Sequence, residues 1–172
     1  MKVYDIIDMV ETIRPGNVFE DKLLLRWLSE CDASLQLEVT RKKPHELKRL
    51  VPEKWDRGLQ YKTGDRVSHV KSGKVYAYTA KENNISADPC DNPDVWTEAE
   101  LVTYVGFPHD NIYYLYLIAM MDFANMEYDK YANDSAMYES AVDEFAKWWQ
   151  RTYSNTHKEG VDEYEVGAEH SY

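Results

Sequence analysis

The chain has 172 residues, and its 31 Asp and Glu against 20 Lys and Arg leave a formal net charge of −11. This length suits one ordinary domain or a domain with one small insertion, and the 30% of charged residues excludes an integral membrane protein. The acidic balance argues against nonspecific DNA binding as the main activity, because such binding needs cations that displace condensed counterions.

Two amphipathic helices are predicted at the start of the chain. Apolar residues recur with helical spacing from Lys2 to Arg14, and Pro15-Gly16 ends the pattern. Asn17, three residues before Glu20, predicts the N-cap of a second helix that runs to about Val39. The apolar stripe of this helix consists of Leu24, Trp27, Leu28, Cys31 and Leu35.

A basic segment follows the second helix and contains Arg41, Lys42, Lys43, Lys48, Arg49 and Lys54. These cations could bind phosphates or an acidic partner, including the acidic tail of another copy of the chain. A solvated loop around Pro44 and Pro52 is the alternative interpretation.

Residues 55–102 are predicted to form a small β unit, because Gly64, Gly73 and Pro89 punctuate short runs of β-type residues. Residues 66–70 and 74–78 alternate with a period of two around a Gly-containing turn, which is typical of a hairpin. Helical periodicity precedes and follows this stretch. The β unit is therefore expected to be an insertion that lies outside a helical frame.

Helical periodicity resumes at residue 109. The helix from Ile112 is apolar on nearly every side over its first half, which indicates a central helix or one held between subunits. Its stripe continues through Tyr128 and Tyr131, and Asn133-Asp134-Ser135 is predicted to break the chain and cap a last helix. The stripe of that helix consists of Tyr138, Ala141, Val142, Phe145, Trp148, Trp149 and Thr152.

The aromatic composition is unusual, with 14 Tyr and 5 Trp against 4 Phe. Tyr and Trp combine a large apolar body with a polar tip, so a surplus of them suits partly wet interfaces. The candidate subunit or partner contacts are Tyr128, Tyr131, Trp148, Trp149, Arg41, Lys42 and Lys43. Ordinary core packing is the alternative interpretation of the Tyr and Trp residues on the last two helices. The acidic residues from 154 to 172 are expected to form an extended tail that orders only on a partner.

No catalytic constellation is evident. The sequence contains no Gly-rich phosphate loop, no G-x-S-x-G motif and no H-E-x-x-H motif. Cys90 and His109 could meet in space as nucleophile and base, but a turn cysteine and a loop histidine are the simpler interpretation. We expect no enzymatic activity, no cofactor and no metal ion. The cysteine pattern and the polar start of the chain favour a compartment with reduced thiols.

Two stretches of the predicted helices carry a recurrent pattern. It comprises Met9-Val10-Glu11, Phe19, Leu24, Trp27-Leu28 and Asp32, and then Met126-Glu127-Tyr128-Asp129-Lys130-Tyr131-Ala132-Asn133-Asp134, Tyr138 and Phe145-Ala146-Lys147-Trp148-Trp149-Gln150-Arg151. Together these stretches resemble the head–tail connector (adaptor) proteins of tailed bacteriophages, over roughly residues 1–39 and 111–153. The resemblance implies a four-helix protomer in a dodecameric ring beneath the portal at the capsid vertex.

The insertion carries a second pattern, which comprises Trp55, Tyr61, Gly64-Asp65, Val67, Gly73-Lys74, Tyr76, Pro89, Asn92-Pro93 and Trp96. It is similar to chitinase-type carbohydrate-binding modules, small β folds whose exposed aromatic rings stack on sugars. The tandem Trp of that pattern is replaced here by Thr79-Ala80-Lys81-Glu82. The resemblance therefore implies the fold rather than sugar binding, with Tyr76 and Trp96 in the core and Tyr61 and Tyr78 as candidate insertion-surface contacts.

The predicted fold is mainly α, with a four-helix connector-type domain (residues 1–54 and 103–153), a small inserted β domain (55–102) and an acidic C-terminal tail (154–172). The resemblance implies a structural virion protein at the head–tail junction, assembled in the host cytoplasm, that forms a ring around the DNA channel. Its expected partners are other copies of itself, the portal protein, tail or further connector proteins, and passing DNA without sequence-specific binding, with no membrane. The alternative is a carbohydrate-binding accessory or adhesion protein whose helices oligomerise the β module.

Overall fold

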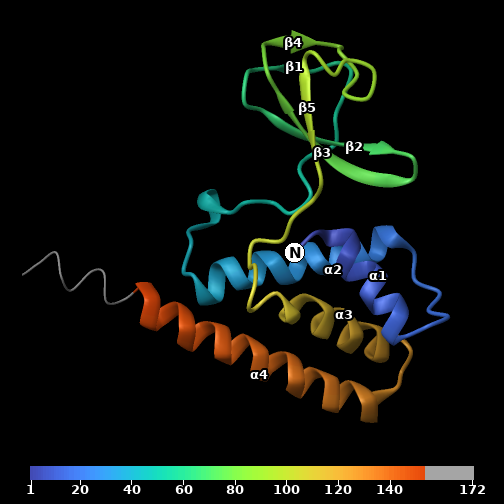
Figure 1. Ribbon diagram of the computed structural model, residues 1–172, viewed down its shortest axis with the longest axis vertical. Helices are drawn as coiled ribbons and strands as arrows, with labels where there is room; N and C mark the ends of the chain where they lie inside the picture. Colours follow the sequence, from blue (N-terminus) through green and yellow to red (C-terminus); the bar gives the residue numbers. More distant parts are fainter. Residues whose placement is uncertain (154–172) are drawn as a thin grey trace, which may run out of the picture.

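The computed structural model describes residues 1–153, and the predicted acidic tail lies outside the described residues. Four α-helices form one part of the molecule: α1 (Val3–Ile13), α2 (Asp21–Ser34), α3 (Asn111–Ala124) and α4 (Tyr128–Tyr153). A small antiparallel β unit from the middle of the chain lies over α2, on the side of the helices away from α4 (Figure 1). The expected combination of four helices with an inserted β unit is therefore present.

The first two helices agree with the periodicity, but the predicted N-cap is wrong. α1 buries Val3, Ile6, Ile7 and Val10. α2 begins at Asp21, four residues after Asn17, because the Asn17 side chain closes a local turn by accepting the Phe19 N–H at 3.1 Å. A π-helical turn, η1 (Leu35–Val39), extends α2 to its predicted end, and a short 3₁₀ turn, η2 (Pro44–Glu46), follows in the basic segment.

The break between the last two helices lies earlier than predicted. α3 ends at Ala124, Met126 has a φ of +60°, and α4 then runs without interruption through residues 133–135. Asp134 does not cap a helix, because its carboxylate accepts a hydrogen bond from Arg14 Nη2 at 2.8 Å. The same Arg14 nitrogen lies 3.1 Å from Asp122, which is buried on α3. Arg14, directly after α1, therefore links α3 and α4.

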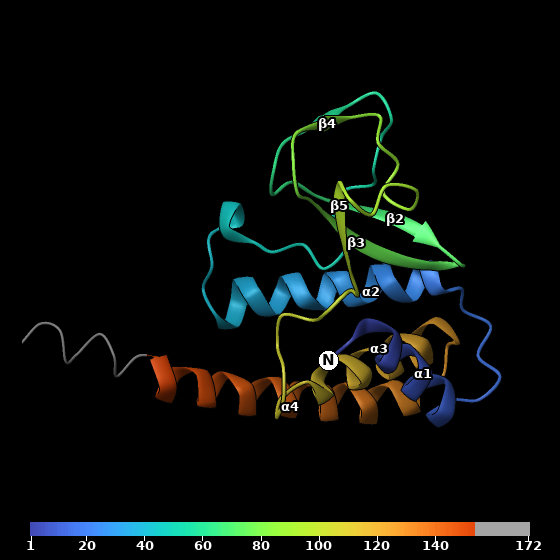
Figure 2. The ribbon, with the colours of Figure 1, turned by 45° about the horizontal axis from the view of Figure 1, so that its top comes forward.

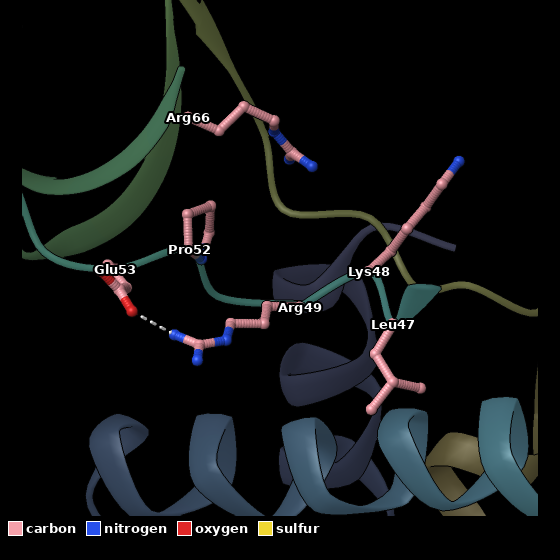
Figure 3. Close-up of a pocket in the computed structure, with 6 residues that line it drawn as sticks. All are labelled: Leu47, Lys48, Arg49, Pro52, Glu53 and Arg66. Carbon is pink, nitrogen blue, oxygen red and sulfur yellow. Dashed lines mark hydrogen bonds and ion pairs between the residues drawn. The ribbon is translucent and has the colours of Figure 1, made fainter. Parts of the chain in front are cut away.

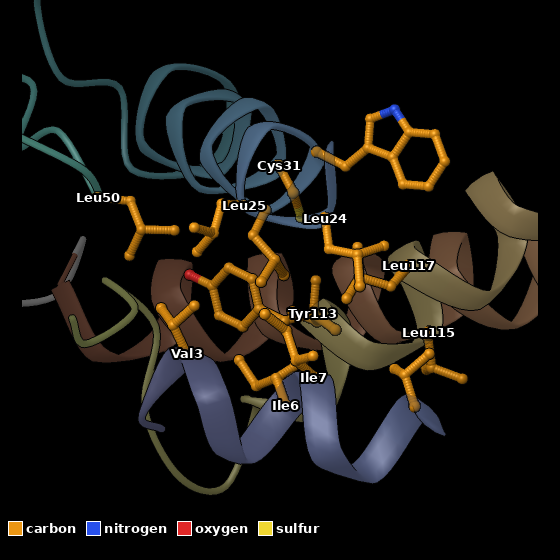
Figure 4. Close-up of a cluster of buried hydrophobic side chains, with 14 of the residues drawn as sticks. Val3, Ile6, Ile7, Leu24, Leu25, Cys31, Leu50, Tyr113, Leu115 and Leu117 are labelled. Atoms are coloured by element: carbon orange, nitrogen blue, oxygen red, sulfur yellow. The ribbon is translucent and has the colours of Figure 1, made fainter. Parts of the chain in front are cut away.

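The helical core is organised around α3. Ile112, Tyr113 and Leu117 are completely buried, and Tyr113 lies between side chains of α1 and α2 (Figure 4). The other buried residues of this helix are Leu115, Ile118, Ala119, Met121 and Asp122. The apolar character of α3 on almost every side is thus explained by its central position, as the sequence suggested.

The strands form two small antiparallel sheets. β2 (Arg66–Lys71), β3 (Lys74–Ala80) and β5 (Trp96–Ala99) pair in the order β2-β3-β5, and β1 (Gln60–Tyr61) pairs with β4 (Asn84–Ile85). The predicted hairpin is confirmed, with Lys71 opposite Lys74. Its turn residues Ser72 and Gly73 have φ values of +50° and +80°, the left-handed geometry that matches the twist of two-residue hairpins.

Strand β3 contributes to both hydrophobic clusters, because neighbouring side chains of a strand point to opposite faces. Ala77 and the half-buried Val75 join the helical core. Tyr78 and Ala80 join the core of the insertion, together with Tyr61, Val67 and Trp96. The sheet therefore packs with one face on the helices, as seen where β3 runs above α2 (Figure 2).

Three further contacts fix the β unit and the segment after it to α1. The Tyr4 hydroxyl accepts the Val75 N–H at 2.7 Å, and Lys74 Nζ lies 4.8 Å from the centroid of the Tyr4 ring. The Val3 N–H donates to the Leu101 carbonyl at 2.9 Å, and Leu101 is itself buried in the helical core. The end of the predicted insertion thus belongs to the packing of the helices.

Asp32 on α2 is a buried acidic residue that holds several segments together. Its Oδ1 accepts the Tyr113 hydroxyl at 2.6 Å and the Tyr104 N–H at 2.7 Å, and its Oδ2 accepts Gln36 Nε2 at 2.9 Å. Gln36 in turn bonds both the N–H and the carbonyl of Lys48. Burial raises the pKa of Asp32, and the three hydrogen bonds oppose this rise by favouring the carboxylate.

The substitution Asp32→Asn is predicted to lower the free energy of unfolding by about 1–3 kcal/mol, because it leaves a buried donor without an acceptor. An amide nitrogen in place of Oδ2 would face Gln36 Nε2, and Gln36 cannot turn over without losing both bonds to Lys48. Urea denaturation followed by circular dichroism measures the effect. The exposed Asp8→Asn serves as the control, and equal stability of the two variants would contradict the prediction.

Replacing residues 55–99 with a short Gly/Ser linker is predicted to preserve the helices, because the cost of loop closure changes slowly with loop length. The melting temperature should fall, since Val75 and Ala77 no longer cover the helical core. Residues Leu101 and Val102 are kept because they contact α1. Loss of most of the helical circular dichroism would show that the insertion is required for the helices to fold.

Candidate interaction surfaces

An aromatic cleft lies at the C-terminal end of α4. Its volume is about 300 Å³, and its lining comprises Tyr104, Val105, Gly106, Phe107, His109, Phe145, Trp148, Trp149 and Tyr153. Trp148 and Trp149 are half-buried, with ring centroids 6.3 Å apart, and Trp149 lies 4.0 Å from Tyr153. Phe107 on the facing loop is 91% exposed. Two of the predicted contact residues therefore line an open cleft of mostly aromatic side chains, which we call the aromatic cleft.

A second apolar surface lies where the last turn of α3 meets the start of α4. Phe123, Met126 and Tyr128 expose 51%, 75% and 60% of their surface, and we call these three residues the N-terminal patch. Phe123 contacts the rings of Tyr128 and Tyr131, at centroid distances of 6.3 and 5.3 Å. The predicted contacts Tyr128 and Tyr131 thus gather at one end of the helix, and Trp148 and Trp149 gather at the other.

The basic segment does not form a single patch. Arg41 and Lys43 are exposed. Lys42 is half-buried, with its Nζ 4.1 Å from the centroid of the Tyr104 ring and 3.4 Å from Gln36 Oε1, so it supports the fold of its own chain.

Farther along the basic segment, a groove of about 360 Å³ is lined by Leu47, Lys48, Arg49, Pro52, Glu53 and Arg66 (Figure 3). Arg49 Nη1 pairs with Glu53 Oε1 at 2.7 Å across this groove. Within residues 1–153, no ion pair involves Lys48 or Arg66, which leaves two cations for an anionic partner.

The expectation that Tyr61 and Tyr78 are exposed on the insertion is wrong. Tyr61 is 7% exposed and Tyr78 is 1% exposed, and both pack with Trp96 in the core of the insertion. The Tyr78 hydroxyl donates to Glu98 Oε2 at 2.9 Å, and burial raises the pKa of Tyr78. Tyr76, expected in this core, is only half-buried against it. The insertion has so few large side chains that nearly all of its aromatic rings are needed to fill its hydrophobic core.

The pairing of Cys90 with His109 is also not observed. His109 lies against Phe145 and Trp148, with ring centroids at 5.5 and 5.2 Å, in the aromatic cleft. Cys90 lies in the insertion, where its Sγ is 3.3 Å from Nδ1 of His69 and where Asp88 is also close. Sequence analysis missed this group because hairpin pairing and a loop bring together residues that lie on separate elements.

Comparisons with known protein families, with curated proteins and with solved structures find no match. Within residues 1–153, no helix combines the length and the apolar character that crossing a membrane requires.

The insertion is predicted not to bind chitin or cellulose, because each of its five aromatic side chains (Trp55, Tyr61, Tyr76, Tyr78 and Trp96) is buried or half-buried. Stacking on a sugar needs a ring face that is open to solvent. Pull-down of the full chain on the insoluble polysaccharides measures retention. Retention that a soluble oligosaccharide reverses, and that Tyr76→Ala weakens, would contradict this prediction.

Proposed function

We propose that the chain is a structural subunit of a ring, and that this ring is a head–tail connector of a tailed bacteriophage. In this proposal, residues 1–54 and 103–153 form a four-helix connector-type domain, and residues 55–102 decorate it. The observation that carries the proposal is the pair of apolar surfaces at opposite ends of α4, the N-terminal patch and the aromatic cleft.

The two surfaces favour association of copies from head to tail. α4 has 26 residues and therefore spans about 39 Å at the usual rise per residue. The surfaces at its ends differ in composition and shape, so the N-terminal patch of one subunit can fill the aromatic cleft of the next. Contacts between unlike surfaces generate a ring when the rotation closes, whereas a two-fold dimer uses the same surface on both subunits.

The exposure of these side chains supports an interface rather than a free surface. Phe107, Met126 and Tyr128 are each at least 60% exposed, and aromatic and Met side chains are enriched at subunit contacts. Rings at partly wet interfaces contribute apolar area while keeping a polar tip in water. The proposed contact therefore accounts for part of the Tyr and Trp surplus that the helical core does not bury.

The net charge of the chain suits the wall of a channel through which DNA passes. A net charge of −11 per subunit repels the phosphate backbone, so DNA would move through the opening without being retained. The proposed partners are other copies of the chain, the portal protein, and tail or further connector proteins. The buried rings of the insertion favour this function over the carbohydrate-binding alternative.

The substitutions Phe107→Asp and Tyr128→Asp are each predicted to abolish ring assembly, because each places a charge in one half of the proposed contact. Both side chains are largely exposed, so the fold should survive. Native mass spectrometry and multi-angle light scattering measure the mass of the assemblies. A mixture of the two variants should form a one-to-one dimer, since each variant keeps one intact surface of opposite type.

Leu59→Asp is the matched control, because Leu59 is 55% exposed but lies on the insertion. It should assemble like the unsubstituted chain. A monomer at all concentrations, or rings that survive both charged substitutions, would contradict the proposed assembly.

The connector role itself is tested separately. Electron microscopy of rings mixed with the portal protein encoded nearby should show the two stacked on one axis. Genes for the large terminase, the portal and the major capsid protein alongside would support the same conclusion. Rings that do not bind the portal would leave the assembly intact but refute the connector role.

A further inference from the structure

Three side chains with metal-binding chemistry meet in the insertion. His69 lies on β2, and Asp88 and Cys90 lie in the segment between β4 and β5. Cys90 Sγ is 3.3 Å from His69 Nδ1, and Asp88 Oδ2 is 3.5 Å from His69 Nε2. One ligand atom from each residue lies within 4.8 Å of the other two.

Neighbouring groups orient two of the three side chains, His69 and Asp88. The Val70 carbonyl lies 3.0 Å from His69 Nδ1, so a proton on Nδ1 leaves Nε2 free to bind a metal ion. Asp88 Oδ1 accepts the Cys90 N–H at 2.9 Å, which leaves Oδ2 free. The Tyr78 hydroxyl lies 3.5 Å from Cys90 Sγ.

We propose that His69, Asp88 and Cys90 bind a zinc ion. Imidazole, carboxylate and thiolate are the three donor types that Zn²⁺ takes in proteins, and their bond lengths place the ligand atoms of a tetrahedral site about 3.3–3.6 Å apart. The separation of 3.5 Å between His69 Nε2 and Asp88 Oδ2 matches this spacing, whereas Cys90 Sγ lies beside Nδ1 of the same ring and has to move toward Nε2. Rotation of the partly exposed Cys90 side chain would bring its Sγ to the ion, and a water molecule would complete the fourth position.

The ion would stabilise the part of the insertion with the least regular structure. The buried core of the insertion consists of only Tyr61, Val67, Tyr78, Ala80 and Trp96. Small units with such cores gain stability from a metal ion or another cross-link. A zinc ion would join the segment after β4 to the hairpin strand β2, and binding to the folded chain alone would raise its stability.

Metal titration of the full chain tests the proposal, after treatment with a chelator. Isothermal titration calorimetry with Zn²⁺ should give one ion per chain. A thermal denaturation experiment should give a higher melting temperature with Zn²⁺ than without it. Co²⁺ in place of Zn²⁺ should give a sulfur-to-cobalt charge-transfer band in the near ultraviolet, which requires a thiolate ligand. Cys90→Ser should abolish this band and raise the Kd for Zn²⁺ at least about tenfold.

The substitution Asp88→Asn tests Zn²⁺ binding without disturbing the fold. The amide keeps an oxygen that accepts the Cys90 N–H, so the turn is preserved while the anionic ligand is lost. This variant should retain the circular dichroism of the unsubstituted chain and bind Zn²⁺ at least about tenfold more weakly. The control is His45→Gln, because the side chain of His45 is 74% exposed and lies in the basic segment.

Three results would overturn the proposal. The first is a chelator-treated chain that binds no Zn²⁺. The second is Zn²⁺ binding that Cys90→Ser and Asp88→Asn leave unchanged, which would assign the ion to other residues such as His157 and His170. The third is a Co²⁺ complex of the unsubstituted chain without a charge-transfer band.

Discussion

The arrangement of the helices depends on a buried carboxylate. Asp32 is 2% exposed, and it is satisfied only when α2, the Tyr104 backbone and the Tyr113 side chain of α3 come together. A buried carboxylate without these donors would cost far more than any one of the contacts contributes. Gln36 extends the same network to the backbone of Lys48. The segment that leads from the helices to the insertion is therefore fixed to α2 at Lys48.

The position of the insertion follows from a second constraint, the alternation of β3. Ala77 faces the helical core while Tyr78 faces the core of the insertion, so one strand is shared by two hydrophobic clusters. This sharing explains why an insertion with a small core can hold a fixed place on the helices. The cluster of His69, Asp88 and Cys90 lies beside Tyr78, at the edge of this small core. A metal ion bound there would add a cross-link to a unit that buries few side chains of its own.

α4 connects this folded body to the proposed assembly. Its middle is anchored by Phe145 and by the pairing of Asp134 with Arg14, while apolar side chains are left exposed at both ends. The exposed aromatic residues near its two ends are the surfaces that we propose form the contact between subunits. The proposed head-to-tail contact and the proposed zinc site occupy different parts of the molecule, so neither depends on the other.

The sequence by itself determined the helical stretches, the hairpin and the apolar character of α3 on nearly every side, because each follows from local periodicity and turn chemistry. Only the tertiary structure decided the rest. The helix break falls at Met126, and α4 continues through Asp134, which pairs with Arg14, 120 residues away in the chain. Whether Tyr78 is core or surface depends on which face of β3 packs on the helices. His69 on β2 meets Cys90 because the segment between β4 and β5 lies against that strand. Periodicity shows which residues share a face of an element, but it does not show what that face packs against.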